Sequence, residues 1–273
     1  MAKQRQTLRS AKKLGLVHIL RRKVMLKSIL AIALTTICFY NFADAAEPVG
    51  QCNAVTDCDT RSEWYFPDWL GSSPHSPVFE VRDAENKYGR YTKKTKTITL
   101  KDLIKFHGHF CGGLVESAAS MRVAFDRLFP DGIIDRTDLR IVSNNSACGA
   151  DVASYLTGAR ARFGSHVIDN TLTESEFYVQ RISNGKTVYV KLNPAVYPKE
   201  VKTQMKKIES GSFSPGDIDL FQELQWAYAK RMVNRPLDES FIVGEIKGYV
   251  WPSSVCKDLG TRKDNDYKNV REK

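Results

Sequence analysis

Residues 176–192, EFYVQRISNGKTVYVKL, are the stretch that decides the fold class. Two runs of alternating side chains, rich in β-branched and aromatic residues, flank the dipeptide Asn184-Gly185. Asn-Gly adopts the left-handed backbone that a tight hairpin turn requires. The sequence therefore predicts an antiparallel hairpin with strands over residues 176–182 and 187–192.

Helical and strand patterns lie on both sides of the hairpin in mixed order. Apolar residues after Gly112-Gly113 recur at steps of four and three, which places them on one helical face: Leu114, Ala118, Met121, Phe125 and Leu128. Other helices are predicted from Thr99, from about Ala147 to Arg162, and near residues 198–209 and 217–234, with short strands over residues 139–143 and 241–246. This order indicates an α+β fold, a mixed sheet packed by helices, rather than a doubly wound sheet.

The net charge of +10 over 273 residues comes mainly from the N-terminus. Residues 1–46 hold nine of the 41 Lys and Arg residues but one of the 31 Asp and Glu residues. The rest of the chain is therefore nearly neutral and lacks the basic surface that binding to DNA or RNA requires. We expect no nucleic-acid partner.

The N-terminus has the pattern of an export signal. Four basic residues, Arg21, Arg22, Lys23 and Lys27, precede an uncharged and mostly apolar stretch over residues 28–43. Small residues in Ala43-Asp44-Ala45 suit a signal peptidase, so we expect a signal peptide over residues 1–45, with Met25 as an alternative start. The signal would be the protein's sole contact with the membrane, and its cleavage would leave a periplasmic or secreted protein. The alternative is an uncleaved N-terminal anchor.

The remainder divides into three predicted parts. Residues 46–98 combine four prolines with serines and aromatic residues, which predicts an irregular, aromatic-rich arm. Residues 99–255 form the α+β domain, and residues 256–273 are a charged tail. Within the arm, Cys52 and Cys58 are close in a turn-rich segment, and we expect them to form a disulfide in an exported protein.

The densest chemical motif is FHGHFCGG, residues 106–113. If this segment is extended, His107, His109 and Cys111 point to one side; if it is helical, His107 and Cys111 still share a face. Neutral imidazole and thiolate are ligands that zinc accepts readily. The glycines after Cys111 would let backbone approach the site closely.

A second motif, CGAD at residues 148–151, follows a predicted strand and opens a helix. Cys148 and Asp151 are three residues apart and therefore share a helical face. Cys111 and Cys148 would both lie near helix N-termini, where the thiol pKa is lowered. They would hold one metal together or face each other as a redox pair. Asp151 would be a ligand, the partner that orients an imidazole, or a general base.

At these residues the sequence resembles the FmdE family, which takes its name from formylmethanofuran dehydrogenase. The segment 106–114 resembles its signature, and Cys148-x-x-Asp151 with the glycines at 158 and 164 resembles its second block. The resemblance implies an α+β domain that often dimerises, with a groove lined by His and Cys residues. It also implies a divalent metal, commonly zinc, at four residues, His107, His109, Cys111 and Cys148, with Asp151 adjacent. Family members usually have proline where this chain has Gly112.

Three functions follow from these motifs. The first is an exported metal-binding protein, which would have a metal-dependent activity on a small molecule if one coordination position is open. The second is a thiol-redox protein that uses Cys111 and Cys148. The third is a binding module of a periplasmic complex, with the aromatic residues at 64–69 as a docking element. The sequence contains no nucleotide-binding loop, nucleophile elbow or haem attachment motif.

Overall fold

The predicted hairpin lies at the centre of a five-stranded sheet in the computed structural model, which describes residues 66–84 and 94–252. Strands β6 (Phe177–Arg181) and β7 (Thr187–Leu192) pair antiparallel, and Gly185 has a φ of 69° at the turn. The order is β5-β4-β6-β7-β8, completed by β4 (Leu139–Ser143), β5 (His166–Ile168) and β8 (Phe241–Ile246). Since β4 and β5 run parallel and the other pairs antiparallel, the sheet is mixed and the α+β prediction is confirmed.

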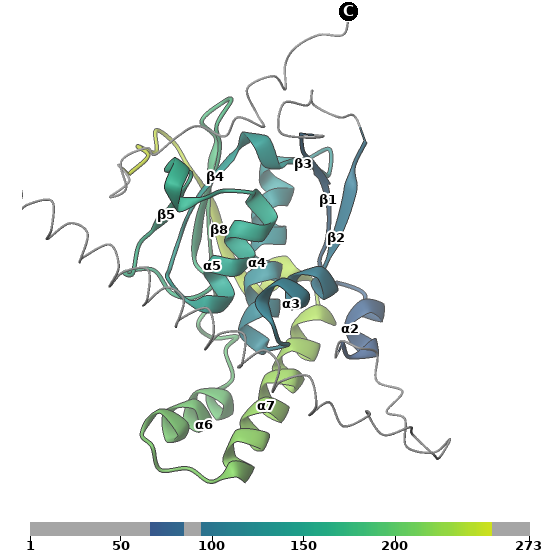
Figure 1. Ribbon diagram of the computed structural model, residues 1–273, viewed down its shortest axis with the longest axis vertical. Helices are drawn as coiled ribbons and strands as arrows, with labels where there is room; N and C mark the ends of the chain where they lie inside the picture. The colour runs from purple at the N-terminus through teal and green to yellow at the C-terminus, as the bar shows by residue number, and fades with distance from the viewer. Residues whose placement is uncertain (1–65, 85–93, 253–273) are drawn as a thin grey trace, which may run out of the picture. The chain divides into compact units, whose positions relative to one another are not determined.

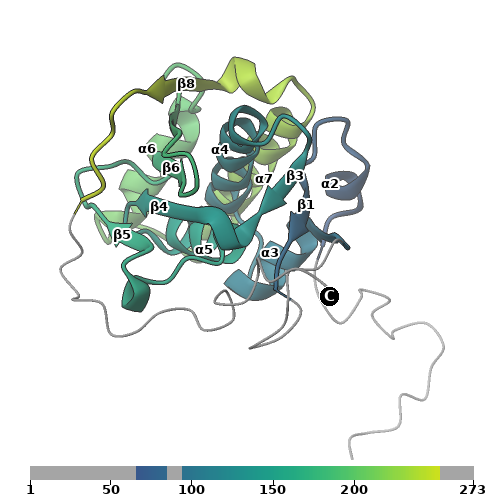
Figure 2. The same ribbon diagram turned by 90° about the horizontal axis from the view of Figure 1, so that it is seen from above.

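Helix α4 (Gly112–Leu128) forms the centre of the core. All five residues of its predicted apolar face are at most 2% exposed. The helix packs across β6, β7 and β8, and on its other side lie β1 (Val78–Arg82) and β3 (Ile133–Asp135) (Figure 2). Burial of this face therefore joins the two sheets of the molecule.

The third predicted helix is shorter than expected. Helix α5 (Ala147–Thr157) crosses from β4 to β5 and ends before Gly158, whose φ of 68° is left-handed and whose N–H donates to Ser154 O. The prediction of a helix as far as Arg162 was wrong because glycine at this position caps the helix early. A 3₁₀ turn, η2 (Ala161–Phe163), follows and ends at Gly164.

The described part of the predicted arm is not wholly irregular. It contains α2 (Asp68–Ser72), β1 and β2 (Lys96–Thr99), and β1 joins β2 and β3 in a sheet of order β2-β1-β3. Phe79 and Val81 alternate inward on β1 and are fully buried, and the Phe79 ring meets the Phe125 ring edge-on at 6.0 Å. The period-two burial of this short strand overrides the turn-rich composition around it.

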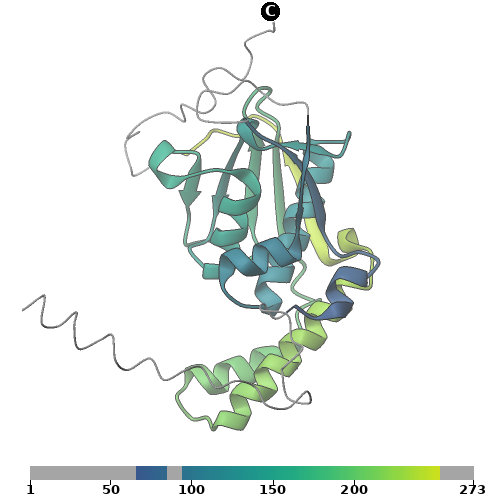
Figure 3. The ribbon, with the colours of Figure 1, turned by 45° about the vertical axis from the view of Figure 1, so that its right-hand side comes forward.

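The remaining helices carry the site and a projecting hairpin. Helix α3 (Leu100–His107) follows Thr99, where a helix was predicted to begin, and the Asp102 carboxylate accepts hydrogen bonds from the N–H and Oγ1 of Thr99. Helices α6 (Lys199–Glu209) and α7 (Pro215–Val233) pack as a hairpin that extends away from the sheet (Figures 1 and 3). Two 3₁₀ turns, η1 (Arg136–Asp138) and η3 (Leu237–Ser240), precede β4 and β8.

Several sequence predictions lie outside the described residues. They are the signal peptide over 1–45, the first part of the arm with Cys52 and Cys58, and the tail over 256–273. All described residues belong to one compact unit. Among them, none of the helices combines the length and the apolar character needed to cross a bilayer.

Candidate metal centre

The motif at residues 106–113 bends sharply instead of forming one helix or one strand. Gly108, with a φ of 99°, ends α3, and its N–H donates to Ile104 O. The chain then passes through His109 and Phe110 to Cys111, the N-cap of α4, whose Sγ accepts the Leu114 N–H at 3.4 Å. The left-handed conformation at Gly108, which only glycine adopts readily, thus brings the end of α3 back to the start of α4.

Cys148 reaches the same place from α5. It is the second residue of that helix, after the N-cap Ser146, whose Oγ accepts the Gly149 N–H at 3.1 Å. Helices α3, α4 and α5 contact one another in pairs beside the sheet (Figure 1). The two cysteines therefore lie at the N-terminal ends of two helices that meet.

Three ligand atoms converge here, and we call His107, Cys111 and Cys148 the thiol cluster. The Sγ atoms of Cys111 and Cys148 are 3.3 Å apart, and His107 Nε2 lies 4.0 and 3.7 Å from them. In a tetrahedral zinc site, Zn–S and Zn–N bonds of about 2.3 and 2.0 Å separate two sulfurs by about 3.8 Å, and sulfur from nitrogen by about 3.5 Å. The donor atoms match this arrangement to about half an ångström, so the residues fit a zinc ion.

Asp151 orients the His107 imidazole through the ring nitrogen that faces away from the sulfurs. Its Oδ2 accepts a hydrogen bond from His107 Nδ1 at 2.8 Å, and the His107 side chain is 3% exposed. Asp151 lies one turn after Cys148 on α5, so a single helix supplies both a sulfur and the carboxylate. A carboxylate on Nδ1 directs the Nε2 lone pair toward the sulfurs, which is the usual arrangement around a metal-bound histidine.

The thiol cluster shares its protons unequally. The hydrogen bond from the Cys148 thiol, with the adjacent His107, lowers the pKa of Cys111 to about 4. The same contact raises the pKa of Cys148, and the Cys111 thiolate raises the pKa of His107 to about 9. At neutral pH, without metal, the cluster therefore holds one thiolate, one thiol and one imidazolium. Metal ligation would release the protons of Cys148 and His107.

Glu174 is a further neighbour of the thiol cluster, and it was not among the predicted site residues. Although the residue as a whole is exposed, its carboxyl group approaches Cys148 beside the backbone of Gly113. A Cβ on Gly113 would lie 3.0 Å from Glu174 Oε1 and 3.2 Å from Cys148 Sγ. Glycine is needed here for close approach, as was expected of this pair of glycines. Glu174 lies in a turn 26 residues after Cys148, and no spacing in the sequence marks it.

His109 is placed differently from the other predicted ligands. It is exposed, and its ring lies 4.4 Å from the His107 ring between centroids. It is not part of the group of mutually close ligand atoms found among the described residues. It lines a groove of about 430 Å³ that the buried Cys111 also borders, and α3 and α7 contribute mostly apolar side chains to this groove, such as Phe221 and Trp226. We call this the Cys111 groove; it gives a small molecule access to one side of the thiol cluster.

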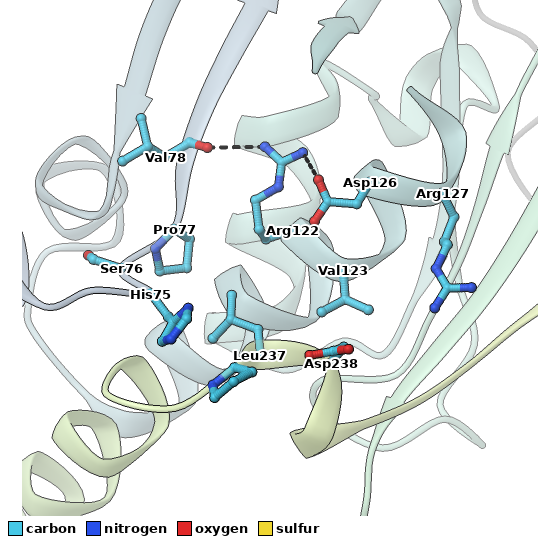
Figure 4. Close-up of a pocket in the computed structure, with 11 residues that line it drawn as sticks. His75, Ser76, Pro77, Val78, Arg122, Val123, Asp126, Arg127, Leu237 and Asp238 are labelled. Carbon is cyan, nitrogen blue, oxygen red and sulfur yellow. Dashed lines mark hydrogen bonds and ion pairs between the residues drawn. The ribbon is translucent and has the colours of Figure 1, made fainter. Parts of the chain in front are cut away.

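A second depression lies elsewhere on the molecule. This cleft of about 640 Å³ is bordered by the loop before β1, the second half of α4 and η3 (Figure 4). Arg122 crosses it and donates to Val78 O at 3.1 Å and to the Asp126 carboxylate. It shares no lining residue with the thiol cluster, so it is not the candidate centre.

A buried carboxyl group lies on α4, one turn after the first helical residues. Glu116 is 6% exposed, and its Oε2 accepts a hydrogen bond from the Tyr228 hydroxyl at 2.7 Å. Burial raises the pKa of Glu116 to about 7. Since the folded-state pKa lies above the unfolded value, the charged carboxylate destabilises the fold, and stability declines as the pH rises from about 4.5 through 7.

Replacing Glu116 by glutamine is expected to remove this decline. A shift from the ordinary 4.5 to about 7 corresponds to about 3 kcal/mol, so the free energy of unfolding of Glu116→Gln should gain about that much relative to wild type between pH 4.5 and pH 8. Urea unfolding at both pH values measures it. Glu209→Gln, on the exposed end of α6, is the control and should leave the decline intact. An equal pH dependence in Glu116→Gln and wild type would contradict the expectation.

Comparisons with known proteins place the motifs in a family. The sequence model of the FmdE family, described as "FmdE, Molybdenum formylmethanofuran dehydrogenase operon", matches residues 106–242. A search of curated proteins gave no significant match. Among solved structures, a tungsten formylmethanofuran dehydrogenase FmdE-like protein from Syntrophus aciditrophicus is similar, with 16% identity, a TM-score of 0.37, and coverage of 55% of this chain and 73% of that one. The residues that the family model matches contain the whole thiol cluster together with Asp151, and on the strength of that match the chain belongs to the FmdE family.

Proposed function

We propose that the protein is an exported metal-binding member of the FmdE family, and that His107, Cys111 and Cys148 hold one divalent metal, zinc. The convergence of one nitrogen and two sulfurs from three helices, all within 4.8 Å of one another, carries this proposal. Cys148 meets Cys111, which lies 37 positions earlier in the sequence, and His107, which lies 41 positions earlier. Simple packing of cysteines in the core does not require such a meeting.

The chemistry of the donors favours zinc. Thiolates are soft ligands and imidazole is an intermediate one, and this combination is typical of zinc rather than of calcium or magnesium. Asp151 adds the carboxylate that orients a metal-bound histidine. A zinc ion held by these three residues would supply Lewis-acid chemistry to a small molecule. The Cys111 groove provides the space for that molecule, and His109 at its edge is a candidate to complete or to support the ligand set.

Export is the second part of the proposal, and the site gives it a chemical consequence. The charged and apolar pattern of residues 21–45 supports a cleaved signal. Two thiols 3.3 Å apart would be oxidised in the periplasm unless something protects them. A bound metal provides that protection, because the thiolate electron pairs are engaged in metal bonds.

A thiol-redox function is the second candidate, favoured by the 3.3 Å separation of the sulfurs and the lowered pKa of Cys111. In that function the Cys111 thiolate attacks a substrate disulfide and releases one substrate thiolate, which takes up a proton. Cys148 then loses its proton and attacks the mixed disulfide, which releases the second substrate thiol and leaves a Cys111–Cys148 disulfide. Two electrons thus pass from the cysteines to the substrate.

The metal content of the purified full chain separates the two functions. We expect about one equivalent of zinc per chain in wild type and less than about a tenth of that in the Cys111→Ser, Cys148→Ser double variant. His75→Ala, which removes a histidine of the cleft in Figure 4, is the control and should keep its zinc. Equal zinc in wild type and in the double variant would refute metal binding at the cluster. In that case a chelator should leave the titration of the two thiols unchanged.

A further inference from the structure

A third cavity lies on the Glu174 side of the thiol cluster. Its volume is about 840 Å³, within the range of small-molecule sites. Its walls come from α4, the turn before β6, the segment between β7 and α6, and the two helices of the projecting hairpin. It shares no lining residue with the Cys111 groove, and we call it the Glu116 cavity.

The inner end of the Glu116 cavity is acidic. Two acidic residues, Glu116 and Glu174, both line it. Tyr197 also lines this end, and its ring meets the Tyr228 ring at 5.4 Å. Glu116 is almost fully buried, so a cation beside it would be poorly screened by solvent and would favour the ionised form of the carboxyl group.

The outer end of the Glu116 cavity is basic. Lys199 and Lys202 line it from the first turn of α6, where the positive end of the helix has the same sign. Neither ammonium group has a partner within the described ranges. Arg231 is also present but is paired with Glu200 at 3.5 Å. Two lysine side chains are therefore available for an anion.

Apolar side chains line the cavity alongside its two charged groups. Leu192, Val196 and Met205 are half-buried and contribute to the lining. A ligand that fits would carry opposite charges separated by an apolar portion. An isolated metal ion would use the acidic end alone, and an isolated anion would use the basic end alone.

We propose that the Glu116 cavity binds a small bipolar molecule, with a cationic amino group between Glu116 and Glu174 and an anionic group at Lys199 and Lys202. Because the Glu174 carboxyl also approaches Cys148, the bound amino group would lie beside the thiol cluster. The assignment of this molecule as a substrate or regulator of the metal centre rests on the proposed function, whereas its binding does not.

The test uses three probes on the purified full chain: 6-aminohexanoate, hexylamine and hexanoate. Calorimetric titration should give an affinity for 6-aminohexanoate at least about tenfold above those of the singly charged probes, because each of those probes lacks the charge-assisted contact at one end of the cavity. Equal affinities, or no binding of 6-aminohexanoate, would overturn the proposal.

Two variants locate the binding. Lys202→Ala, on the surface, should lower the affinity for 6-aminohexanoate at least about tenfold. Glu116→Gln, which removes a charge at the inner end of the cavity, should lower it by a similar factor. Lys206→Ala, exposed on the same helix but outside the cavity, is the control and should bind as wild type does. An unchanged affinity in Lys202→Ala would overturn the proposal even if Glu116→Gln fails to fold. Zinc measured in the same samples keeps the two proposals apart, since loss of zinc with retained binding would reject only the metal centre.

Discussion

Replacing Cys148 by serine should lower zinc affinity more than about 100-fold. The substitution removes one of the two sulfur ligands and leaves a hydroxyl that binds zinc poorly at neutral pH. Asp151→Asn should lower the affinity less, by about 10- to 100-fold, because it only weakens the support of His107. Competition with a coloured chelator on the full chain gives both values.

The order of these two effects distinguishes ligand from support. If Asp151→Asn lowers the zinc affinity more than Cys148→Ser does, then the carboxylate binds the metal and the sulfur does not. If neither variant differs from His75→Ala, the zinc is bound somewhere else on the chain. Circular dichroism of each variant checks that the fold survives, since Cys148 is only half-buried and serine is nearly its size.

Replacing Gly149 by alanine should destabilise the protein by about 3 kcal/mol, at the upper end of ordinary overpacking effects. A Cβ at this position would overlap the backbone oxygen of Glu174 and lie 2.8 Å from Ser146 Oγ. Because the first contact is with backbone, the turn before β6 must move, and Glu174 would move away from Cys148 with it. Urea unfolding measures the loss, and the same variant should bind zinc less tightly.

Gly216→Ala is the matched control for this substitution. Gly216 also lies in the first turn of a helix, α7, but its Cβ would meet only Ser214 Oγ, at 3.9 Å. Alanine there should change stability by less than about 1 kcal/mol, in the favourable direction that helix propensity gives. Equal stability of Gly149→Ala and Gly216→Ala would mean that the contact between α5 and the turn is not tight.

Local patterns predicted most of the fold because burial follows them closely. The Asn184-Gly185 turn and the apolar face of α4 each depend on neighbours within a few residues. The end of α5 was misplaced because two glycines, Gly158 and Gly164, could each cap it, and only the three-dimensional structure shows which one does. Strand β1 was missed because two buried positions in five residues are a weak signal amid prolines.

The candidate site was predictable in part, again because some of its residues are close together in the sequence. His107 with Cys111, and Cys148 with Asp151, are pairs at short spacing, so each pair could be recognised, and the structure brings the two pairs together. Glu174 and Glu116 could not be found this way. They approach the cluster and its neighbouring cavity through packing of α4, α7 and a distant turn, which no local spacing records.

Zinc K-edge X-ray absorption on the full, zinc-loaded chain tests most directly whether Cys111, Cys148 and His107 bind one ion. We predict two sulfur neighbours at about 2.3 Å and at least one nitrogen at about 2.0 Å, with one sulfur lost in Cys148→Ser. A zinc shell of oxygen and nitrogen alone, or two sulfurs that persist in Cys148→Ser, would contradict a centre built on these three residues.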